Sequence, residues 1–364
     1  MKLCQIYNIA PHYRAAIYSL IDEAYDCDLY CSYNKTDIKS INFSLLRGRI
    51  HQLKTVSIGK AYYQFGVPLL AFKSFDAYLV TGDAWCVSTW FFLIYARIMR
   101  KSVYIWTHGL LGKESGIKRK LNLLLLRFAT SVFLYGDRAK QLLLNENFNP
   151  NKLFVVHNSL DYNQQLFIRS RGIVSDIFRT HFGNEEKVLV FIGRLTKVKR
   201  LDILLDALSV LKRQGIIYNL VLVGSGGEQE LLKTYSIKLN LEKQVWFYGE
   251  CYQELQNAKL IYNADICVSP GNVGLTAIHS MVFGTPVISN DDFDSQMPES
   301  EAIIPGKTGA FFAKGNPLSL AEVINKWFVE HRDRDVVRRD CYTEIDNNWT
   351  PSFQFNVIKS VIGE

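Results

Sequence analysis

Cations and glycines follow several short apolar runs of this 364-residue chain, in places suited to an anionic ligand. The clearest case follows the apolar run 187–192, where Gly193 precedes four cations in seven positions, among them Arg194 and Lys199. A glycine followed by Arg and Lys between a strand and a helix suits a diphosphate, because free amides and cations face the ligand. The alternative is a solvated basic turn that binds nothing.

A second glycine-rich turn lies within residues 269–288. The apolar run 264–268 precedes it, and residues 275–283 carry apolar side chains at helix spacing. Such a strand, loop and helix would offer amides and the positive end of a helix dipole to a phosphate or to sugar hydroxyls. The alternative is that the glycines only shape an α/β turn. The expected ligand-binding residues are Gly271, Asn272, Val273, Gly274, Leu275, Thr276 and His279.

Two further turns of the same kind lie between these stretches. Gly224 and Gly226 follow the apolar run 220–223 in an incomplete GxGxxG pattern, which is a weak signal by itself. Glu250 follows the run 245–248. These three residues complete the candidate ligand-binding set of the second half of the chain.

The first half contains candidate residues of a different type. His108 and Gly109 follow the apolar run 102–106, and a histidine at the carboxyl end of a strand is well placed for chemistry. His12 and Arg14 follow the first apolar run, and together with Gly109 they are candidates for binding an acceptor substrate. The alternative for His12 and Arg14 is that they are ordinary residues at the start of a helix.

The elements that would position these residues form an α/β protein. Apolar runs alternate with helical patterns, which predicts doubly wound parallel sheets. A chain that is 48% hydrophobic and this long suits two domains. We expect an N-terminal acceptor-binding domain over 1–170, a ligand-binding domain over 171–350, and a terminal helix over 351–364 that crosses back to the first domain.

The second half resembles a known family. Residues 273–275, 280–281 and 284–287 are similar to the donor-site segment of retaining GT-B glycosyltransferases, glycosyltransferase family 4 of the bacterial surface-polysaccharide type. Arg194 and Lys199 match the Arg and Lys that hold the donor's diphosphate in that family, and Arg200 replaces its usual glycine.

The resemblance implies a fold and an activity. It implies two Rossmann-like domains with a cleft between them, and transfer of a sugar from a nucleotide diphosphate sugar with retention of configuration. It places His108 beside the anomeric centre, Gly224 and Gly226 at the nucleotide, and the backbone near Glu250 at the base. The acceptor hydroxyl would lose its proton to the leaving phosphate, without a metal or a cofactor.

Two departures from the family concern donor choice. The family carries glutamates at the positions of Gly271 and His279, where they contact the donor hexose and the ribose. One hypothesis is a modified donor, such as an amino, deoxy or pentose sugar on deoxythymidine diphosphate. The rival is that Asn272 and His279 make the same hydrogen bonds. Two other functions stay open: a catalytically silent GT-B protein and a nucleotide-sugar epimerase.

The charge distribution indicates an anionic partner for the first half. Residues 1–175 hold 22 Lys and Arg against 11 Asp and Glu, whereas the whole chain has a net charge of +7. The basic, leucine-rich stretch Lys113–Arg127 fits either an interfacial helix on anionic lipid or a core helix. A lipid-linked or free glycan is the expected acceptor. Nucleic acid is disfavoured because no basic stripe with interleaved aromatics appears.

The remaining features bear on location. Seven cysteines without a CxxC pair, mostly within apolar runs, favour a reduced cytoplasmic setting. The longest apolar stretch, residues 84–98, is shorter than the roughly 20 residues of a membrane span. We expect a cytoplasmic protein that is peripheral at the inner face of the membrane, and no metal site.

Overall fold

The computed structural model describes residues 1–32, 39–331 and 333–363. Its contacts divide the chain into two compact units. Unit 1 comprises Met1–Asp161 and Thr350–Glu364, and unit 2 comprises Tyr162–Trp349. The division after Asp161 lies nine residues before the expected boundary, and residue 364 lies outside the described residues.

Unit 1 is built on a seven-stranded parallel sheet with the order β3-β2-β1-β6-β7-β8-β9. Its strands are β1 Lys2–Tyr7, β2 Asp26–Cys31, β3 Arg49–Gln52, β6 Ala77–Thr81, β7 Ser102–Thr107, β8 Ser131–Leu134 and β9 Leu153–Val155. A small hairpin joins β4 Thr55–Ile58 to β5 Ala61–Gln64. Its helices are η1 His12–Arg14, α1 Ala15–Ala24, η2 Phe43–Leu45, η3 Val67–Phe72, α2 Val87–Ile98, α3 Gly116–Arg127, α4 Asp137–Leu144, η4 Pro150–Lys152 and α13 Pro351–Ile362.

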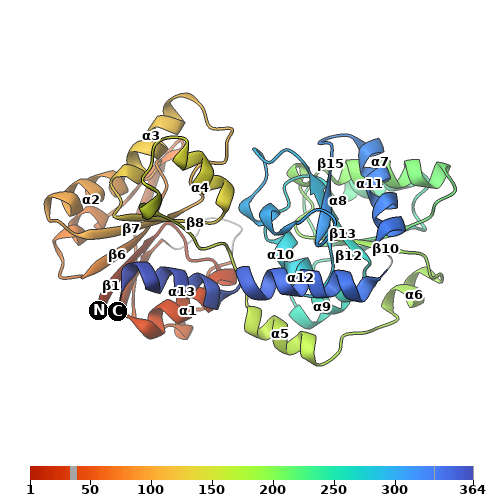
Figure 1. Cartoon of the computed structure of the whole chain (residues 1–364), viewed down its shortest axis with the longest axis horizontal. Coiled ribbons are helices and arrows are strands. Elements are labelled where there is room, and N and C mark those ends of the chain that lie inside the picture. Colours follow the sequence, from red (N-terminus) through yellow and green to blue (C-terminus); the bar gives the residue numbers. More distant parts are fainter. Residues whose placement is uncertain (33–38, 332, 364) are drawn as a thin grey trace. The chain divides into compact units, whose positions relative to one another are not determined.

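Helices cover both faces of this sheet, because its central strands are apolar on both sides (Figure 1). Side chains of α2, α3 and α4 join one core with alternate residues of β1, β6, β7 and β8. Side chains of α1 and α13 join the core on the other face. The C-terminal helix α13 therefore packs within unit 1, where the Tyr25 hydroxyl donates to the Gly363 carbonyl at 2.8 Å.

Unit 2 repeats the plan with a six-stranded parallel sheet in the order β12-β11-β10-β13-β14-β15. Its strands are β10 Val188–Ile192, β11 Asn219–Val223, β12 Val245–Gly249, β13 Ile266–Ser269, β14 Val287–Asn290 and β15 Gly309–Phe312. Its helices are α5 Tyr162–Ser170, α6 Ile177–Phe182, η5 Lys197–Lys199, α7 Leu201–Arg213, α8 Gln229–Lys238, α9 Glu254–Asn263, α10 Thr276–Met281, η6 Pro298–Ala302, α11 Pro317–Glu330 and α12 Arg334–Asn348.

Both sheets have the strand order of a doubly wound Rossmann fold, with a reversal next to the first strand. This confirms the predicted α/β fold with two Rossmann-like domains. In unit 2, helix α10 is shorter than the predicted 275–283, because Gly284 at φ 76° turns the chain toward β14. Ligands of such folds bind where the parallel strands end, so the turns after these strands position the candidate residues.

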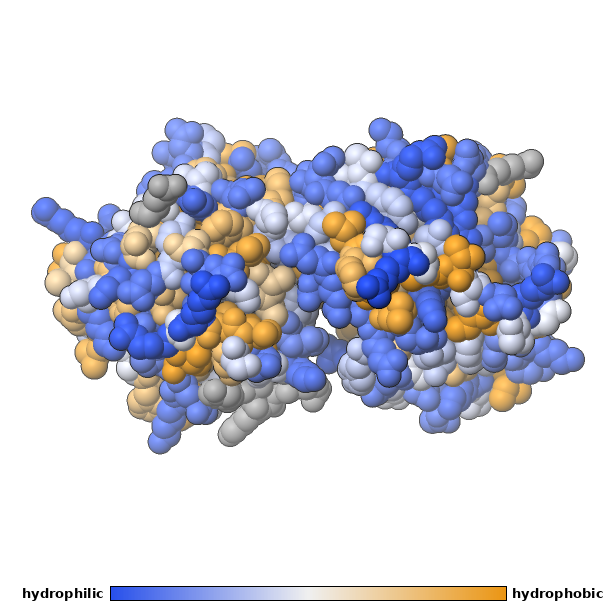
Figure 2. All heavy atoms as spheres, turned by 90° about the horizontal axis from the view of Figure 1, so that it is seen from below, coloured by the Kyte–Doolittle hydropathy of each residue, from blue (hydrophilic) through white to orange (hydrophobic). Residues whose placement is uncertain are grey.

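The apolar and basic helices of unit 1 have mixed faces. In α3, Leu123, Leu125 and Leu126 are buried, whereas Ile117 and Leu124 are 75% and 47% exposed. Within the described residues, none of the helices has the length and apolar character needed to span a bilayer. Figure 2 shows, on the face it views, hydrophobic patches scattered among hydrophilic side chains in both units.

Candidate functional site

The turns after β10 and β11 lie in direct backbone contact. A β-carbon at Gly224 would lie 2.0 Å from the Gly193 carbonyl oxygen, and one at Gly226 would lie 2.3 Å from that of Leu195. The Leu195 amide donates to the Ser225 carbonyl at 2.8 Å, which joins the two turns. Because Gly224 and Gly226 also have positive φ of 136° and 158°, only glycine fits at both positions.

Gly271, in the turn after β13, packs against the backbone of η5. A β-carbon at Gly271 would lie 2.0 Å from the Val198 carbonyl oxygen, and the Gly271 amide donates to the Lys199 carbonyl at 3.0 Å. This backbone therefore leaves no room for a side chain at the position where the resembled family carries its first glutamate. The departure from the family is part of the local fold of the turn.

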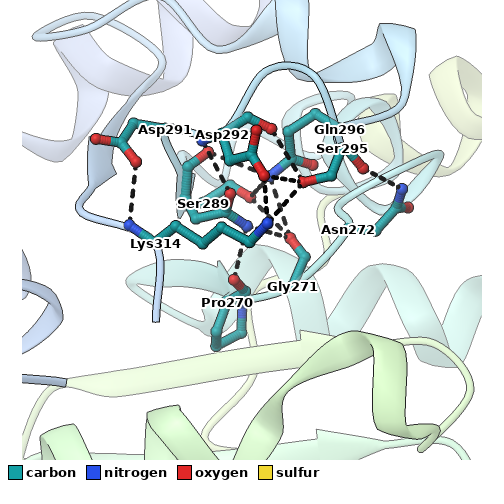
Figure 3. A network of polar contacts seen from close by, with 10 residues as sticks. Pro270, Gly271, Asn272, Ser289, Asp291, Asp292, Ser295, Gln296 and Lys314 are labelled. Carbon is teal, nitrogen blue, oxygen red and sulfur yellow. Dashed lines mark hydrogen bonds and ion pairs between the residues drawn. The ribbon is translucent and has the colours of Figure 1, made fainter. Parts of the chain in front are cut away.

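Buried side-chain amides hold this turn in place (Figure 3). Asn290 Nδ2 donates to the carbonyl oxygens of Pro270 and Gly271, each at 2.8 Å. Gln296 Oε1 accepts from the Val273 amide at 2.9 Å, and Gln296 Nε2 donates to the Gly271 carbonyl at 3.1 Å. Both amide side chains are buried, so water does not compete for these bonds and the turn is fixed before any ligand binds.

Most backbone amides of this turn are used within the protein. The amides of Gly271 and Asn272 donate to carbonyls of η5, and the Val273 amide donates to a side chain. In the part of the chain that the structure describes, the amides of Gly274 and Leu275 have no acceptor. The expectation that the whole turn offers amides to a ligand is thus wrong for residues 271–273. Only the amides of Gly274 and Leu275 remain candidates for binding a ligand.

Arg194 and Lys199 supply the positive charge beside these turns. Lys199 Nζ donates to the Asn272 carbonyl at 2.5 Å, which holds the ammonium group against the Gly271 turn. Burial lowers the pKa of Lys199, and the like charge of Arg194 lowers it further against the opposing effect of Glu299. Arg194 is exposed, and no polar contact of its guanidinium occurs among the described residues. An anion between the two cations would relieve their repulsion.

Arg200 is engaged differently from these two cations. It has φ 48° and pairs with Asp202 at 2.9 Å at the start of α7. This left-handed backbone explains why a glycine is usual at this position in the resembled family. The structure therefore separates Lys199, whose ammonium group is held against the Gly271 turn, from Arg200, which is paired at the start of a helix.

His279 forms a pair with a residue that sequence reasoning missed. Its Nε2 lies 3.0 Å from Glu254 Oε1, and Gln165 Nε2 donates to the same oxygen at 2.8 Å. Burial alone would raise the pKa of Glu254, but His279 and Gln165 outweigh it and lower this pKa to about 2. No signal in the sequence pointed to Glu254, which begins α9. The His279 side chain is thus already paired with a carboxylate of unit 2.

The remaining candidates of unit 2 occupy supporting positions. Thr276 Oγ1 donates to the Ile192 carbonyl at 2.9 Å and ties α10 to the end of β10. Val273 is buried in the core. The Glu250 carboxylate accepts a hydrogen bond from the Ser225 hydroxyl, so it lies beside the turn that contains Gly224. The candidates predicted after four separate strands therefore do gather at one edge of this sheet.

His108 and Gly109 lie in the turn after β7 of unit 1. Gly109 has φ 65°, and a β-carbon there would lie 2.8 Å from Leu134 Cδ2, so glycine is required. The half-buried His108 ring lies 4.6 Å from the Tyr135 ring, centroid to centroid. Burial and the nearby Arg14 charge lower the pKa of His108 to about 4, so the imidazole is neutral at pH 7.

Arg14 lies in an aromatic cluster that the sequence did not reveal. Its guanidinium carbon is 5.3 Å from the Trp106 ring centroid and 4.9 Å from that of Tyr135. Among the described residues, four buried polar atoms of this cluster have no hydrogen-bond partner: Arg14 Nε, Tyr18 Oη, Trp106 Nε1 and His108 Nδ1. No signal identified the aromatic residues, because their apolar runs fit ordinary core strands.

His12 does not belong to this cluster and makes its contacts elsewhere. Its side chain is exposed, and its Nδ1 lies 3.1 Å from the Lys39 carbonyl oxygen. Its backbone amide donates to the same oxygen at 3.0 Å. His12 therefore contacts the backbone at Lys39, and the two neighbouring acceptor-site candidates have different structural roles.

The described residues contain no group of three or more His, Cys, Asp or Glu side chains that would hold a metal ion. All seven cysteines are free thiols, and six of them are buried. The chemistry that the two sets of residues offer is therefore binding of anions and hydroxyls through cations, amides and one neutral histidine.

The comparisons with known proteins point to one family. Residues 175–340 match the model of the family Glycosyl transferases group 1. The chain is 32% identical to an uncharacterised glycosyltransferase of Methanocaldococcus jannaschii over 175 residues, which are 45% of this chain and 43% of the relative. It is 31% identical over 167 residues to a GDP-mannose-dependent alpha-(1-6)-phosphatidylinositol dimannoside mannosyltransferase of Mycobacterium tuberculosis, again over 45% of this chain and 40% of the relative. The chain thus aligns with less than half the length of these relatives.

Solved structures match over the whole chain at low identity. HepE of Anabaena in complex with UDP superposes with a TM-score of 0.74 at 17% identity, covering 100% of this chain and 99% of HepE. A glycosyltransferase of Rickettsia africae superposes with a TM-score of 0.75 at 14% identity, covering 99% of this chain and 97% of that protein. The chain therefore has the GT-B fold, and its residues 175–340 are similar to a Glycosyl transferases group 1 domain.

Proposed function

We propose that the protein is a retaining glycosyltransferase of family 4, which transfers a sugar from a nucleotide diphosphate sugar to a glycan acceptor. The observation that carries this proposal is the pair Arg194 and Lys199, with Lys199 held against the same turn in which the amides of Gly274 and Leu275 are unused. The two cations would neutralise the charge that develops on the leaving diphosphate, an electrostatic effect that is large in such reactions. Relatives that match the same domain and are named glycosyltransferases support the assignment.

The other candidate residues have supporting roles in this proposal. His108, neutral at pH 7, is assigned to positioning groups at the reacting face, where it would donate or accept a hydrogen bond without carrying charge. The leaving phosphate itself would accept the proton of the acceptor hydroxyl. Neither a metal nor a cofactor is part of the proposal.

The donor base and sugar in this proposal are suggested by the departures from the family. Gly271 has no room for a side chain, and Asn272 already donates its amide to the Ser295 carbonyl at 3.1 Å. These contacts weaken the idea that Asn272 replaces the missing glutamate. They support a donor with fewer hydroxyl contacts, such as an amino, deoxy or pentose sugar on deoxythymidine diphosphate.

The test is thermal unfolding of the full chain with UDP, GDP and deoxythymidine diphosphate, and with their sugar conjugates. One nucleotide should raise the melting temperature by mass action, and the double variant Arg194→Ala with Lys199→Ala should lose this shift. Lys197→Ala is the matched control, since Lys197 is an exposed cation of the same turn. Preference for a ribonucleotide would exclude the deoxythymidine version, and the absence of any shift would overturn the proposal.

Turnover separates the transferase from its two rivals. Release of nucleoside diphosphate from the stabilising nucleotide sugar would exclude a catalytically silent nucleotide-binding protein. Nuclear magnetic resonance of the product sugar would distinguish retention at the anomeric carbon from an epimerised nucleotide sugar. Binding without turnover, with or without membranes as a source of acceptor, would favour the silent protein that the loss of both glutamates suggests.

The acceptor in this proposal is a lipid-linked glycan of surface polysaccharide synthesis, such as capsule or O-antigen, at the cytoplasmic face of the membrane. Support comes from α3, where exposed Ile117 and Leu124 lie among the cations Lys118, Lys120 and Arg127. Co-sedimentation with phosphatidylglycerol vesicles at low salt tests it, with phosphatidylcholine vesicles as the control. Lys118→Gln with Lys120→Gln should release the protein, and no binding of the wild type would exclude this surface.

A further inference from the structure

We propose that the aromatic cluster around Arg14 binds a singly charged oxyanion, a carboxylate or a phosphodiester, that the acceptor carries. The cluster comprises Arg14, Tyr18, Trp106, His108 and Tyr135, which come from the η1–α1 segment and the ends of β7 and β8. All five residues belong to unit 1. That the oxyanion belongs to the acceptor rests on the proposed function, whereas the site itself is inferred from these contacts alone.

The first observation is a half-buried cation without a carboxylate partner. Among the described residues, no carboxylate forms an ion pair or a hydrogen bond with Arg14. The titratable groups that act on its guanidinium are three tyrosines, Tyr13, Tyr18 and Tyr135, together with His108. Aromatic rings attract the positive charge, but ring faces do not accept the in-plane N–H bonds of a guanidinium. An oxyanion would satisfy both the charge and the donors.

The second observation is the set of polar atoms left without partners. Arg14 Nε and Trp106 Nε1 are donors only, and both are buried without an acceptor. His108 Nδ1, which is able to donate, is also buried and unpartnered. The Tyr18 hydroxyl lies close enough to the Arg14 guanidinium to act on its pKa as an acceptor, but its own proton has no acceptor. Buried polar groups in proteins are nearly always hydrogen-bonded, so unpaired donors gathered in one cluster indicate a ligand that accepts. Tyr18 and Trp106 are 1% and 2% exposed, so their atoms are held in place by the core.

The charge of the cluster sets the charge of the ligand. Burial raises the pKa of Tyr18 and Tyr135, which keeps both hydroxyls neutral at pH 7. The pKa of His108, lowered to about 4, keeps the imidazole neutral as well. Arg14 is therefore the single formal charge, and it would neutralise a monoanion. A phosphate monoester, with nearly two negative charges, would leave an uncompensated charge in a buried place.

The location of the cluster fits a substrate. Trp106 and His108 lie at the carboxyl end of β7, Tyr135 directly follows β8, and Arg14 lies in the segment after β1. Ligands of doubly wound folds bind at this edge of the parallel sheet. Arg14 and His108 both remain partly exposed, so the cluster is open to ligand at these two residues.

The experiment follows the indole N–H signal of Trp106 in the full chain, assigned among the six tryptophans by Trp106→Phe. Acetate, glucuronate and dimethyl phosphate are titrated at constant ionic strength, with glucose as the neutral analogue of glucuronate. A saturable shift with an anion, and none with glucose, is expected. The carboxylate and phosphodiester arms tell which group the site prefers. Shifts that stay linear with every anion would overturn the proposal.

Arg14→Gln removes the charge and the donor fork, and should weaken anion binding by about tenfold or more. Arg14→Lys keeps the charge without the fork and should give an intermediate loss, which preserves the test if the first variant does not fold. Arg97→Gln is the matched control, because Arg97 also lies over a ring, at 5.9 Å from the Phe128 centroid, but is exposed. An unchanged anion shift in Arg14→Gln would refute the site.

The nucleotide assay separates this inference from the proposed function. Arg14→Gln should keep the melting-temperature shift by the stabilising nucleotide, since Arg14 belongs to unit 1 and the diphosphate residues to unit 2. Loss of the anion shift with nucleotide binding retained supports the site. Loss of both would show that Arg14 only holds the fold. A wild type that binds nucleotide but no anion would leave the transferase proposal intact and defeat the inference.

Discussion

The two units of this chain share a strand order, but backbone forms the candidate site of unit 2 and side chains form that of unit 1. Unit 2 uses backbone: Gly224 and Gly271 let neighbouring turns touch at distances that no side chain would allow. Unit 1 uses side chains: Arg14, Trp106 and His108 meet in a cluster with unpaired polar atoms. The comparison teaches that one topology supports closely packed backbone turns at the strand ends of one copy and an incompletely hydrogen-bonded side-chain cluster at the strand ends of the other.

The largest expected effect tests the backbone contacts of unit 2. Gly224→Ala places a β-carbon 2.0 Å from the Gly193 carbonyl, so the turns must separate, and we expect the free energy of unfolding to fall by about 4 kcal/mol. Urea unfolding measures it. Gly227→Ala is the control, because no atom lies within 4 Å of its β-carbon position. If both variants are equally stable, the backbones at Gly193 and Gly224 are not held in close contact.

The two sites should also differ in the pH range over which they affect stability. The His108 pKa of about 4 lies below the value of 6.5 for a free histidine, so the unfolded chain binds this proton first. Stability should therefore fall as the pH drops from 6.5 toward 4, by up to about 3 kcal/mol. The Glu254 pKa of about 2 lies below the ordinary 4.5, so its contribution is present above pH 4.5 and is lost toward pH 2.

Unfolding curves recorded between pH 7 and pH 3 measure both effects. His108→Gln should flatten the dependence between pH 6.5 and 4 only, and Glu254→Gln should flatten the lower range only. Equal slopes in wild type and His108→Gln would mean that the histidine is well solvated and that its pKa is not lowered by burial.

The sequence revealed the backbone-built site better than the side-chain-built one. Glycines and cations directly after apolar runs identified Gly193, Arg194 and Lys199, because a turn signal and its strand lie next to each other in the chain. The same local logic identified both Rossmann-like folds. It placed His108 and Arg14 at strand ends, but gave no indication that they share a cluster.

The missed features all depend on packing between distant segments. Glu254 and His279 are 25 residues apart on two helices, and nothing in either local pattern announces their contact. The use of the Gly271 and Val273 amides within the protein depends on η5 and Gln296, which periodicity does not place. Which amides of a turn remain free for a ligand can therefore be told only from the tertiary structure, even where the turn itself is predictable from the sequence.

An intermediate effect concerns the second missing glutamate. His279→Glu would place a carboxylate beside Glu254, whose oxygen is now 3.0 Å from the His279 ring. We expect a loss of about 2 kcal/mol in the free energy of unfolding from like-charge repulsion in a half-buried site. Combining it with Glu254→Gln should recover most of the loss, since the repulsion is then removed. Additive effects in this double-mutant cycle would mean that the two positions do not interact.

The smallest expected effect is the most informative about unit 1. Arg14→Met removes a buried charge together with its contacts to two rings, and these contributions oppose each other, so the free energy of unfolding should change by no more than about 1 kcal/mol. A structural arginine would behave differently, because removing one partner of a satisfied buried network is strongly destabilising. Thermal unfolding with saturating glucuronate or dimethyl phosphate should then separate the variants. The anion should stabilise the wild type by mass action and leave Arg14→Met unchanged. A large loss of stability in the absence of any anion would instead show that Arg14 has a structural role in the core. Unit 1 would then have no side-chain site to set against the backbone turns of unit 2.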